Sequence, residues 1–211
     1  MTDVQGSSDG YSPIARRAAL VIATVAAITF LTRIYLRSGD DGGVVGAISY
    51  LSQFFTILTN AIVMVLMLLI ASGRHAPVRW MKAVVIAIVI VGIIYHLLLA
   101  HLVEFVGLAF WADHGVHTVV PALSVLWWLV FALKPPLRAV DLIIWVAWPV
   151  LYCTYILIRA NFSGFYPYPF LNLPELGWSG LSISIARMLV SFVVVGLILT
   201  AIGRIASTVR N

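Results

Sequence analysis

The chain has 211 residues, of which 62% are hydrophobic and only 10% are charged, against ~25% charged residues in an ordinary soluble domain. No soluble fold of this length could bury so much apolar surface, so the composition excludes a water-soluble globular protein and indicates an integral membrane protein. The net charge of +5 is spread over the ends of apolar segments rather than gathered in one basic run, which argues against nucleic-acid binding.

Six apolar segments follow one another along the chain, and a membrane-spanning helix needs ~20 such residues. We therefore predict an all-α fold, a polytopic transmembrane bundle of six helices. The expected spans are residues 15–36, 47–71, 79–103, 113–133, 141–158 and 181–205. We expect a mobile polar tail over residues 1–13, a single six-span domain over 14–207 and a C-terminal tail over 208–211, with no room for a soluble domain.

The distribution of Lys and Arg predicts the orientation, because the loops that face the cytoplasm carry an excess of them. Nine of the 13 Lys and Arg residues lie on the side of the termini: Arg16, Arg17, Arg74, Arg79, Lys82, Lys134, Arg138, Arg204 and Arg210. The other four are Arg33, Arg37, Arg159 and Arg187. Both termini are therefore expected in the cytoplasm.

Polar side chains gather in the expected outer half of the membrane. Polar groups inside a bilayer are costly, so they usually face the interior of a bundle and often belong to a functional site. In the second segment they recur at steps of four, three and four, which predicts one helical face. We expect a single polar pocket that opens to the outer leaflet. Its candidate members are Ser49, Gln53, Thr56, Asn60, His96, His101, Glu104, Asp113, His114, His117, Ser184, Arg187 and Ser191.

A hydroxyl beside an imidazole is sufficient for acyl transfer, because the imidazole takes the proton of a hydroxyl that attacks an ester carbonyl. Neutral donors such as Gln53 or Asn60 could stabilise the oxyanion. Outside the polar N-terminal tail the chain has no Gly-x-Ser-x-Gly pattern, and without such an elbow between a strand and a helix an α/β-hydrolase is excluded.

Other readings stay open at this point. Ser, Thr, Asn and Gln in spanning helices often only pack helices together. The histidines with Asp113 and Glu104 could instead hold zinc or iron, although their spacing is a weak metal pattern. A non-enzymatic small-molecule transporter or scaffold is the third possibility, and the lack of repeated halves disfavours a transporter.

Three stretches resemble a bacterial family of six-span membrane proteins. They are residues 49–60, Ser-Tyr-Leu-Ser-Gln-Phe-Phe-Thr-Ile-Leu-Thr-Asn, residues 114–121, which begin His-Gly-Val-His-Thr, and residues 164–171, which contain Tyr-Pro-Phe. That family is similar to the eukaryotic androgen-induced and androgen-dependent membrane proteins, which hydrolyse fatty acid esters of hydroxy fatty acids. The chain departs from the eukaryotic members at Asp113, where an amide is expected, and in a shorter connection between spans two and three.

The resemblance implies a threonine nucleophile at Thr56 with His117 as its base, no metal or other cofactor, and a lipid substrate within the bacterial cytoplasmic membrane. We expect Asp113 either to raise the basicity of a nearby histidine or to cap the fourth span. Arg159 or Arg187 would bind a substrate carboxylate near the outer interface. The expected substrate-binding residues are Gln53, Asn60, His96, Asp113, His114, Arg159 and Arg187.

Overall fold

The computed structural model describes the backbone of residues 10–39, 42–101 and 104–209, and every regular element within these ranges is helical. The all-α class is therefore confirmed for the described part of the chain. The elements are α1 (Pro13–Ser38), α2 (Gly43–Leu51), α3 (Phe55–Ala71), α4 (Val78–Ile94), the π-helix η1 (Tyr95–Leu99), α5 (Gly107–His114), the π-helix η2 (Gly115–Val119), α6 (Val120–Phe131), α7 (Ala139–Ser163), the 3₁₀-helix η3 (Pro169–Leu171) and α8 (Leu173–Val209).

Five described helical segments are long and apolar enough to cross a membrane. They are Pro13–Ser38, Val78–Leu99, Gly107–Phe131, Ala139–Ser163 and Leu173–Ala206. A sixth crossing results if the bent pair α2 and α3 counts as one span. The chain is thus a multi-pass integral membrane protein, with five or six crossings depending on how that pair sits in the bilayer.

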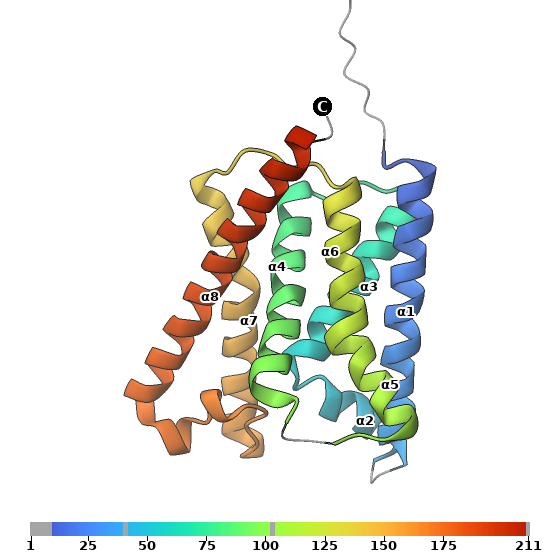
Figure 1. Cartoon of the computed structure of the whole chain (residues 1–211). Coiled ribbons are helices and arrows are strands. Elements are labelled where there is room, and N and C mark those ends of the chain that lie inside the picture. The colour runs from blue at the N-terminus through green and yellow to red at the C-terminus, as the bar shows by residue number, and fades with distance from the viewer. Residues whose placement is uncertain (1–9, 40–41, 102–103, 210–211) are drawn as a thin grey trace, which may run out of the picture.

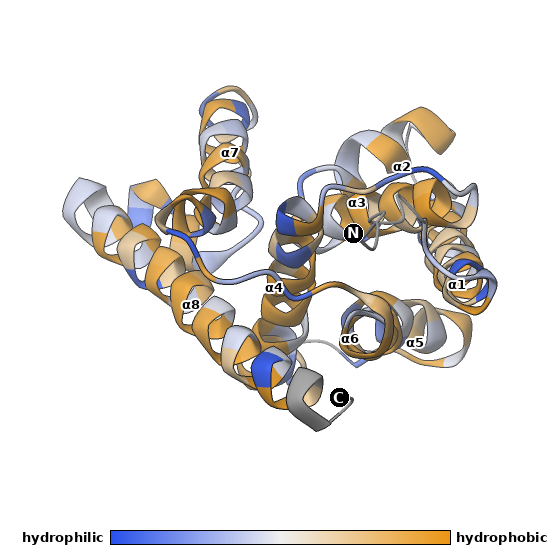
Figure 2. Ribbon diagram, turned by 90° about the horizontal axis from the view of Figure 1, so that it is seen from above, coloured by the Kyte–Doolittle hydropathy of each residue, from blue (hydrophilic) through white to orange (hydrophobic). Residues whose placement is uncertain are grey.

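Helix α4 lies at the centre of the bundle. It contacts α3, α6, α7 and α8, and the view along the bundle shows these helices around it (Figure 2). Over residues 83–94 its sequence is aliphatic on every face, and a helix that is hydrophobic all round is stable where neighbours cover it. Both described ends of the chain lie at the same end of the bundle (Figure 1).

The second expected span is not a straight helix. Helices α2 and α3 meet at 97° across the break between Leu51 and Phe55. Non-helical backbone at membrane depth needs protein partners for its polar groups, and two tyrosines supply them. The Tyr152 hydroxyl donates to the Gln53 carbonyl oxygen at 2.7 Å, and the Phe55 N–H donates to the Tyr168 hydroxyl at 3.1 Å.

This bend corrects the expectation of one polar helical face. Ser49 lies on α2 and is exposed, whereas Thr56 and Asn60 lie on α3 and are buried. Four regularly spaced polar residues are therefore divided between two helices and the break between them.

The fourth span begins earlier than expected. Helix α5 begins at Gly107, with Val106 at its N-cap, so Asp113 lies inside the helical segment and does not cap it. The helix then widens into the π-helix η2, and α4 widens in the same way into η1. Such π-turns are rare in regular helices and are frequent at functional sites.

The tail regions are described only in part. Residues 1–9 of the expected N-terminal tail and residues 210–211 of the C-terminal tail lie outside the described residues. Tyr11, which precedes α1, packs edge-on against Trp127 with ring centroids 5.0 Å apart.

Candidate functional site

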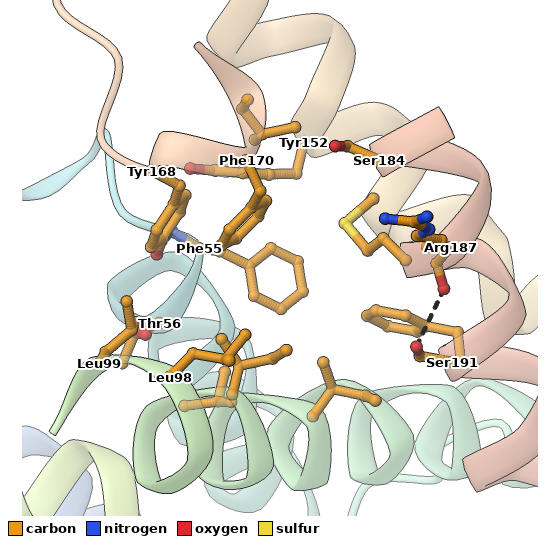
Figure 3. A pocket seen from close by; sticks show the side chains of 16 residues that line it. Phe55, Thr56, Leu98, Leu99, Tyr152, Tyr168, Phe170, Ser184, Arg187 and Ser191 are labelled. Carbon is orange, nitrogen blue, oxygen red and sulfur yellow. Dashed lines mark hydrogen bonds between the residues drawn. The ribbon is translucent and has the colours of Figure 1, made fainter. Parts of the chain in front are cut away.

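A cavity of about 300 Å³ lies between α3, the end of α4 with η1, α7, η3 and α8. Figure 3 shows the 16 side chains that line it, most of which are apolar. Its polar lining residues are Thr56, Tyr152, Tyr168, Ser184, Arg187 and Ser191. A mostly apolar cavity with few polar groups is typical of a small-molecule site.

Thr56 lies in the first turn of α3, directly after the bend. Thr56 is 8% exposed and lines the cavity. Because the first turn of a helix has backbone N–H groups without intrahelical acceptors, the bend places the Thr56 hydroxyl beside amide donors that need a partner outside the helix. A straight second span would have paired those amides within the helix.

The Tyr168 phenol occupies this helix start. Its oxygen accepts the Phe55 N–H and also interacts with the hydroxyl and the amide of Thr56. Burial raises the pKa of the Tyr168 phenol above its ordinary value, while the contacts with Thr56 and Phe55 lower it only in part. The phenol therefore stays protonated at neutral pH and can donate a hydrogen bond.

His117 is held from two sides within η2. Its Nδ1 lies 3.0 Å from the backbone oxygen of Asp113 and 3.3 Å from Oδ1 of the same residue. The Tyr95 ring stacks on the imidazole with centroids 3.9 Å apart and an interplanar angle of 9°. Asp113 is paired in turn with Arg33, at 3.3 Å. These contacts fix the imidazole ring and leave Nε2 as the nitrogen that can act on another group.

The hydrogen bonds of the described residues do not include one between Thr56 and His117, and His117 does not line the cavity. Asn60 connects their surroundings instead. Its Nδ2 donates to the Thr56 carbonyl oxygen at 2.8 Å and to the Val116 carbonyl oxygen at 3.0 Å. Thr56 and His117 thus lie on turns that Asn60 ties together, while their side chains are not in contact.

Three of the expected binding residues, Gln53, His96 and His114, lie outside the cavity. The Gln53 side chain donates to the Tyr50 carbonyl oxygen within the bend. His96 is exposed and contacts the Thr118 hydroxyl at 3.0 Å, and His114 contacts the Phe110 carbonyl oxygen at 3.1 Å. The expected single pocket is thus not formed, because Thr56 and Arg187 line the cavity and the histidines do not.

Arg159 and Arg187, the two arginines expected to bind a substrate carboxylate, differ in their surroundings. Arg159 donates to the Ser49 carbonyl oxygen at 2.8 Å and contacts the hydroxyls of Ser49, Ser52 and Tyr155. Arg187 lines the cavity, and its guanidinium makes no hydrogen bond or ion pair within the part of the chain that the structure describes. Figure 3 shows Arg187 on α8, across the cavity from Thr56.

Metal ligation was the rival reading of the histidines and acids. Within residues 10–39, 42–101 and 104–206, no group of three or more His, Cys, Asp or Glu side chains is close enough to hold a metal ion. His101 and Glu104 are both exposed next to residues outside the described ranges.

Sequence reasoning missed four residues of this region. Tyr168 and Tyr152 support the bend, and of the two only Tyr168 lies within a stretch that carries the family resemblance, residues 164–171. Arg33 and Tyr95 hold Asp113 and His117. A charged residue within an apolar span signals an internal partner, and Arg33 carries that signal.

Comparison with known proteins relates the chain to one family. No curated protein and no solved structure matches it. The family model described as FAR-17a/AIG1-like protein matches residues 93–203, slightly more than half of the chain. The matched region includes His117, Tyr168 and Arg187, whereas Thr56 lies before it. The chain belongs to the FAR-17a/AIG1-like family.

Proposed function

We propose that the protein is an intramembrane threonine hydrolase that cleaves a lipid ester, such as a fatty acid ester of a hydroxy fatty acid, through an acyl-threonine intermediate. One observation carries the proposal. The Thr56 hydroxyl lies at the start of a bent helix, on the wall of an apolar cavity and beside a buried phenol. The resemblance of the chain to ester hydrolases agrees with this placement.

The base in this proposal is Nε2 of His117. Both atoms that face Nδ1, the Asp113 backbone oxygen and Oδ1, are hydrogen-bond acceptors, so Nδ1 carries the proton of the neutral ring. The lone pair is then on Nε2. When the ring takes a second proton, the Asp113 carboxylate stabilises the imidazolium, as the acid of a catalytic triad does.

The reaction proceeds in two halves. Nε2 removes the proton of Thr56 Oγ1 while the oxygen attacks the ester carbonyl carbon, and the protonated ring then gives that proton to the departing alcohol oxygen. Water attacks the acyl-threonine in the second half, with Nε2 again accepting the proton. The fatty acid is released and Thr56 recovers its hydroxyl.

This sequence requires Thr56 Oγ1 and His117 Nε2 to come within hydrogen-bond distance when substrate binds. Catalytic hydrogen bonds often form only in the substrate complex. Two features allow the approach. Thr56 lies in the first turn of α3, directly after the bend, and His117 lies in a π-turn, so neither residue is held within a regular stretch of α-helix.

The oxyanion of the tetrahedral intermediate would be stabilised at the start of α3. The Tyr168 oxygen already accepts from the Phe55 amide, so its own proton points to another acceptor. The phenol O–H is therefore available to a carbonyl oxygen held against Thr56. Donors fixed in advance in a buried site are the largest single contribution to many acyl-transfer enzymes.

Arg187 would bind the substrate carboxylate. It faces the same cavity as Thr56 and makes no ion pair within the described residues, and an ionisable group in a spanning helix without a partner is a candidate for ligand binding. Arg159 is less suited because its donors are used by Ser49, Ser52 and Tyr155.

Labelling of the detergent-purified protein with a fluorophosphonate probe tests the nucleophile. We expect covalent labelling of the wild type on Thr56, located by peptide mass spectrometry, and its loss in Thr56→Ala. Thr154→Ala is the matched control, since Thr154 is exposed on α7 and bonds only its own helix. Full ester hydrolysis by a folded Thr56→Ala variant would rule the mechanism out, because cleavage would then not pass through an acyl intermediate on Thr56.

A further inference from the structure

A second cavity, of about 250 Å³, lies at the end of the bundle where both described chain ends are found. The start of α4, the connection between α6 and α7 and the last turns of α8 enclose it. It has no lining residue in common with the cavity at Thr56. Its lining residues are Lys82, Trp128, Leu133, Lys134, Pro135, Pro136, Leu199, Thr200, Gly203 and Arg204.

The charge of this cavity is one-sided. Three cationic side chains line it, from Lys82, Lys134 and Arg204, and the lining includes no carboxylate. Asp141 acts electrostatically on Lys82 from nearby, but it is ion-paired with Arg79 and accepts the Arg138 N–H at 2.8 Å. Lys82 is in addition repelled by Arg79 and Arg204. A bound anion would relieve this repulsion.

The cationic groups are held in place by polar partners. The Lys134 ammonium donates to the carbonyl oxygens of Trp128, Leu129 and Ala132 at the end of α6, at 3.1, 3.0 and 2.8 Å. Lys82 donates to the Thr200 hydroxyl, so it joins α4 to α8. The positive charges are therefore fixed around the cavity before any ligand binds.

Trp128, which lines this cavity, carries a buried donor without an acceptor among the described residues. Trp128 is 1% exposed, and its indole Nε1 is a buried atom without a hydrogen-bond partner in the described structure. Buried donors are nearly always paired, so an orphaned one calls for an explanation. An acceptor-only ligand beside Lys82 and Arg204 would supply one.

We propose that this cavity binds the phosphate of an anionic phospholipid headgroup. A phosphate offers only acceptors to this set of donors and cations. The spans α4, α6 and α8 begin or end here, so the cavity lies at the membrane boundary, where headgroup phosphates lie. The apolar part of the lining, including Leu133 and Leu199, suits a lipid better than a free ion. Basic pockets between spanning helices bind lipid headgroups in this way.

The test uses the full chain in nanodiscs of phosphatidylcholine, with or without phosphatidylglycerol. Native mass spectrometry of the released protein counts the bound lipids, and thermal unfolding is followed in parallel. We expect phosphatidylglycerol to be retained in excess over its share and to raise the Tm. The variants Lys82→Gln and Arg204→Gln, which lie on different helices, should each weaken its retention about fivefold.

The control is Arg74→Gln, which removes one positive charge at the same end of the bundle from an exposed residue outside the cavity. Retention should be unchanged in this variant. Equal weakening by Arg74→Gln would show diffuse surface attraction and overturn the proposal, as would full retention in both cavity variants. A Tm rise as large with inorganic phosphate alone, in phosphatidylcholine nanodiscs, would assign the cavity to a free anion rather than a lipid.

Discussion

His117 and Asp113 lie one helical turn apart, and Nδ1 of the histidine faces both the backbone oxygen of Asp113, at 3.0 Å, and its Oδ1, at 3.3 Å. The backbone contact alone is enough to keep the proton on Nδ1. The carboxylate adds a negative charge that favours the imidazolium, and Arg33 holds that carboxylate in place. The backbone oxygen of Asp113 thus fixes the tautomer of His117, whereas the Asp113 carboxylate stabilises the protonated ring.

This division predicts a moderate effect of Asp113→Asn. The backbone oxygen still fixes the tautomer, so kcat should fall by roughly tenfold to a hundredfold rather than by the ~10⁴ seen when a triad loses the correct tautomer. Steady-state hydrolysis kinetics would measure the change, with KM nearly constant. Glu104→Gln, which neutralises an exposed acid, should leave kcat as in the wild type. An unchanged kcat in Asp113→Asn would remove Asp113 from the proposed mechanism.

The Tyr168 phenol leads to a second prediction. Tyr168→Phe keeps the ring in the cavity wall but removes the hydroxyl beside Thr56, so kcat should fall by about 10²–10³, the usual cost of one oxyanion donor. KM should change little. Tyr166→Phe is the matched control, because Tyr166 belongs to the same loop and does not line the cavity.

The folding of Tyr168→Phe must be followed alongside, because the lost hydroxyl also leaves the Phe55 amide without its acceptor. Circular dichroism and a thermal melt would separate the two effects. A variant with wild-type kcat would show that Tyr168 only supports the bend.

Arg187 allows a test of substrate charge. Arg187→Gln should raise KM for a lipid ester with a free carboxylate by about tenfold to a hundredfold, since a hydrogen bond to a charged group contributes ~1.5–3 kcal/mol. The methyl ester of the same substrate, which lacks the charge, should show the same KM in variant and wild type. Arg159→Gln should lower the Tm without altering this preference, because Arg159 ties α7 to α2. If Arg159→Gln abolished the preference for the free carboxylate over the methyl ester and Arg187→Gln retained it, Arg159 and not Arg187 would bind the carboxylate.

Composition and hydropathy predicted the all-helical membrane fold because spanning segments of ~20 apolar residues are a local signal. The bend before Phe55 was not predicted. The partners of its backbone groups are Tyr152 and Tyr168, which are about a hundred residues away in sequence and give no local pattern. The spacing of polar residues did place Thr56 and Asn60 correctly on one buried side of a helix. Which polar residues line the cavity depends on helix packing, and spacing carries no information on that.

The packing of η2 against α1 gives a final prediction, on stability. A Cβ added to Gly115 would lie 2.1 Å from Cγ2 of Thr29, far inside van der Waals contact. Gly115→Ala should therefore force η2 away from α1 and cost about 1–3 kcal/mol, the usual penalty of overpacking a core. A lower Tm in detergent would show it.

The folded fraction of Gly115→Ala is also expected to hydrolyse substrate more slowly than the wild type, because Gly115 lies two residues before His117 in the same π-turn. The double variant Thr29→Ala with Gly115→Ala should recover much of the stability, since the clash involves the Thr29 methyl. Gly39→Ala is a control at the end of α1, where the added Cβ would meet nothing within 4 Å and the Tm should stay as in the wild type. A Tm equal to that of the wild type in Gly115→Ala would contradict the close approach of α1 and η2.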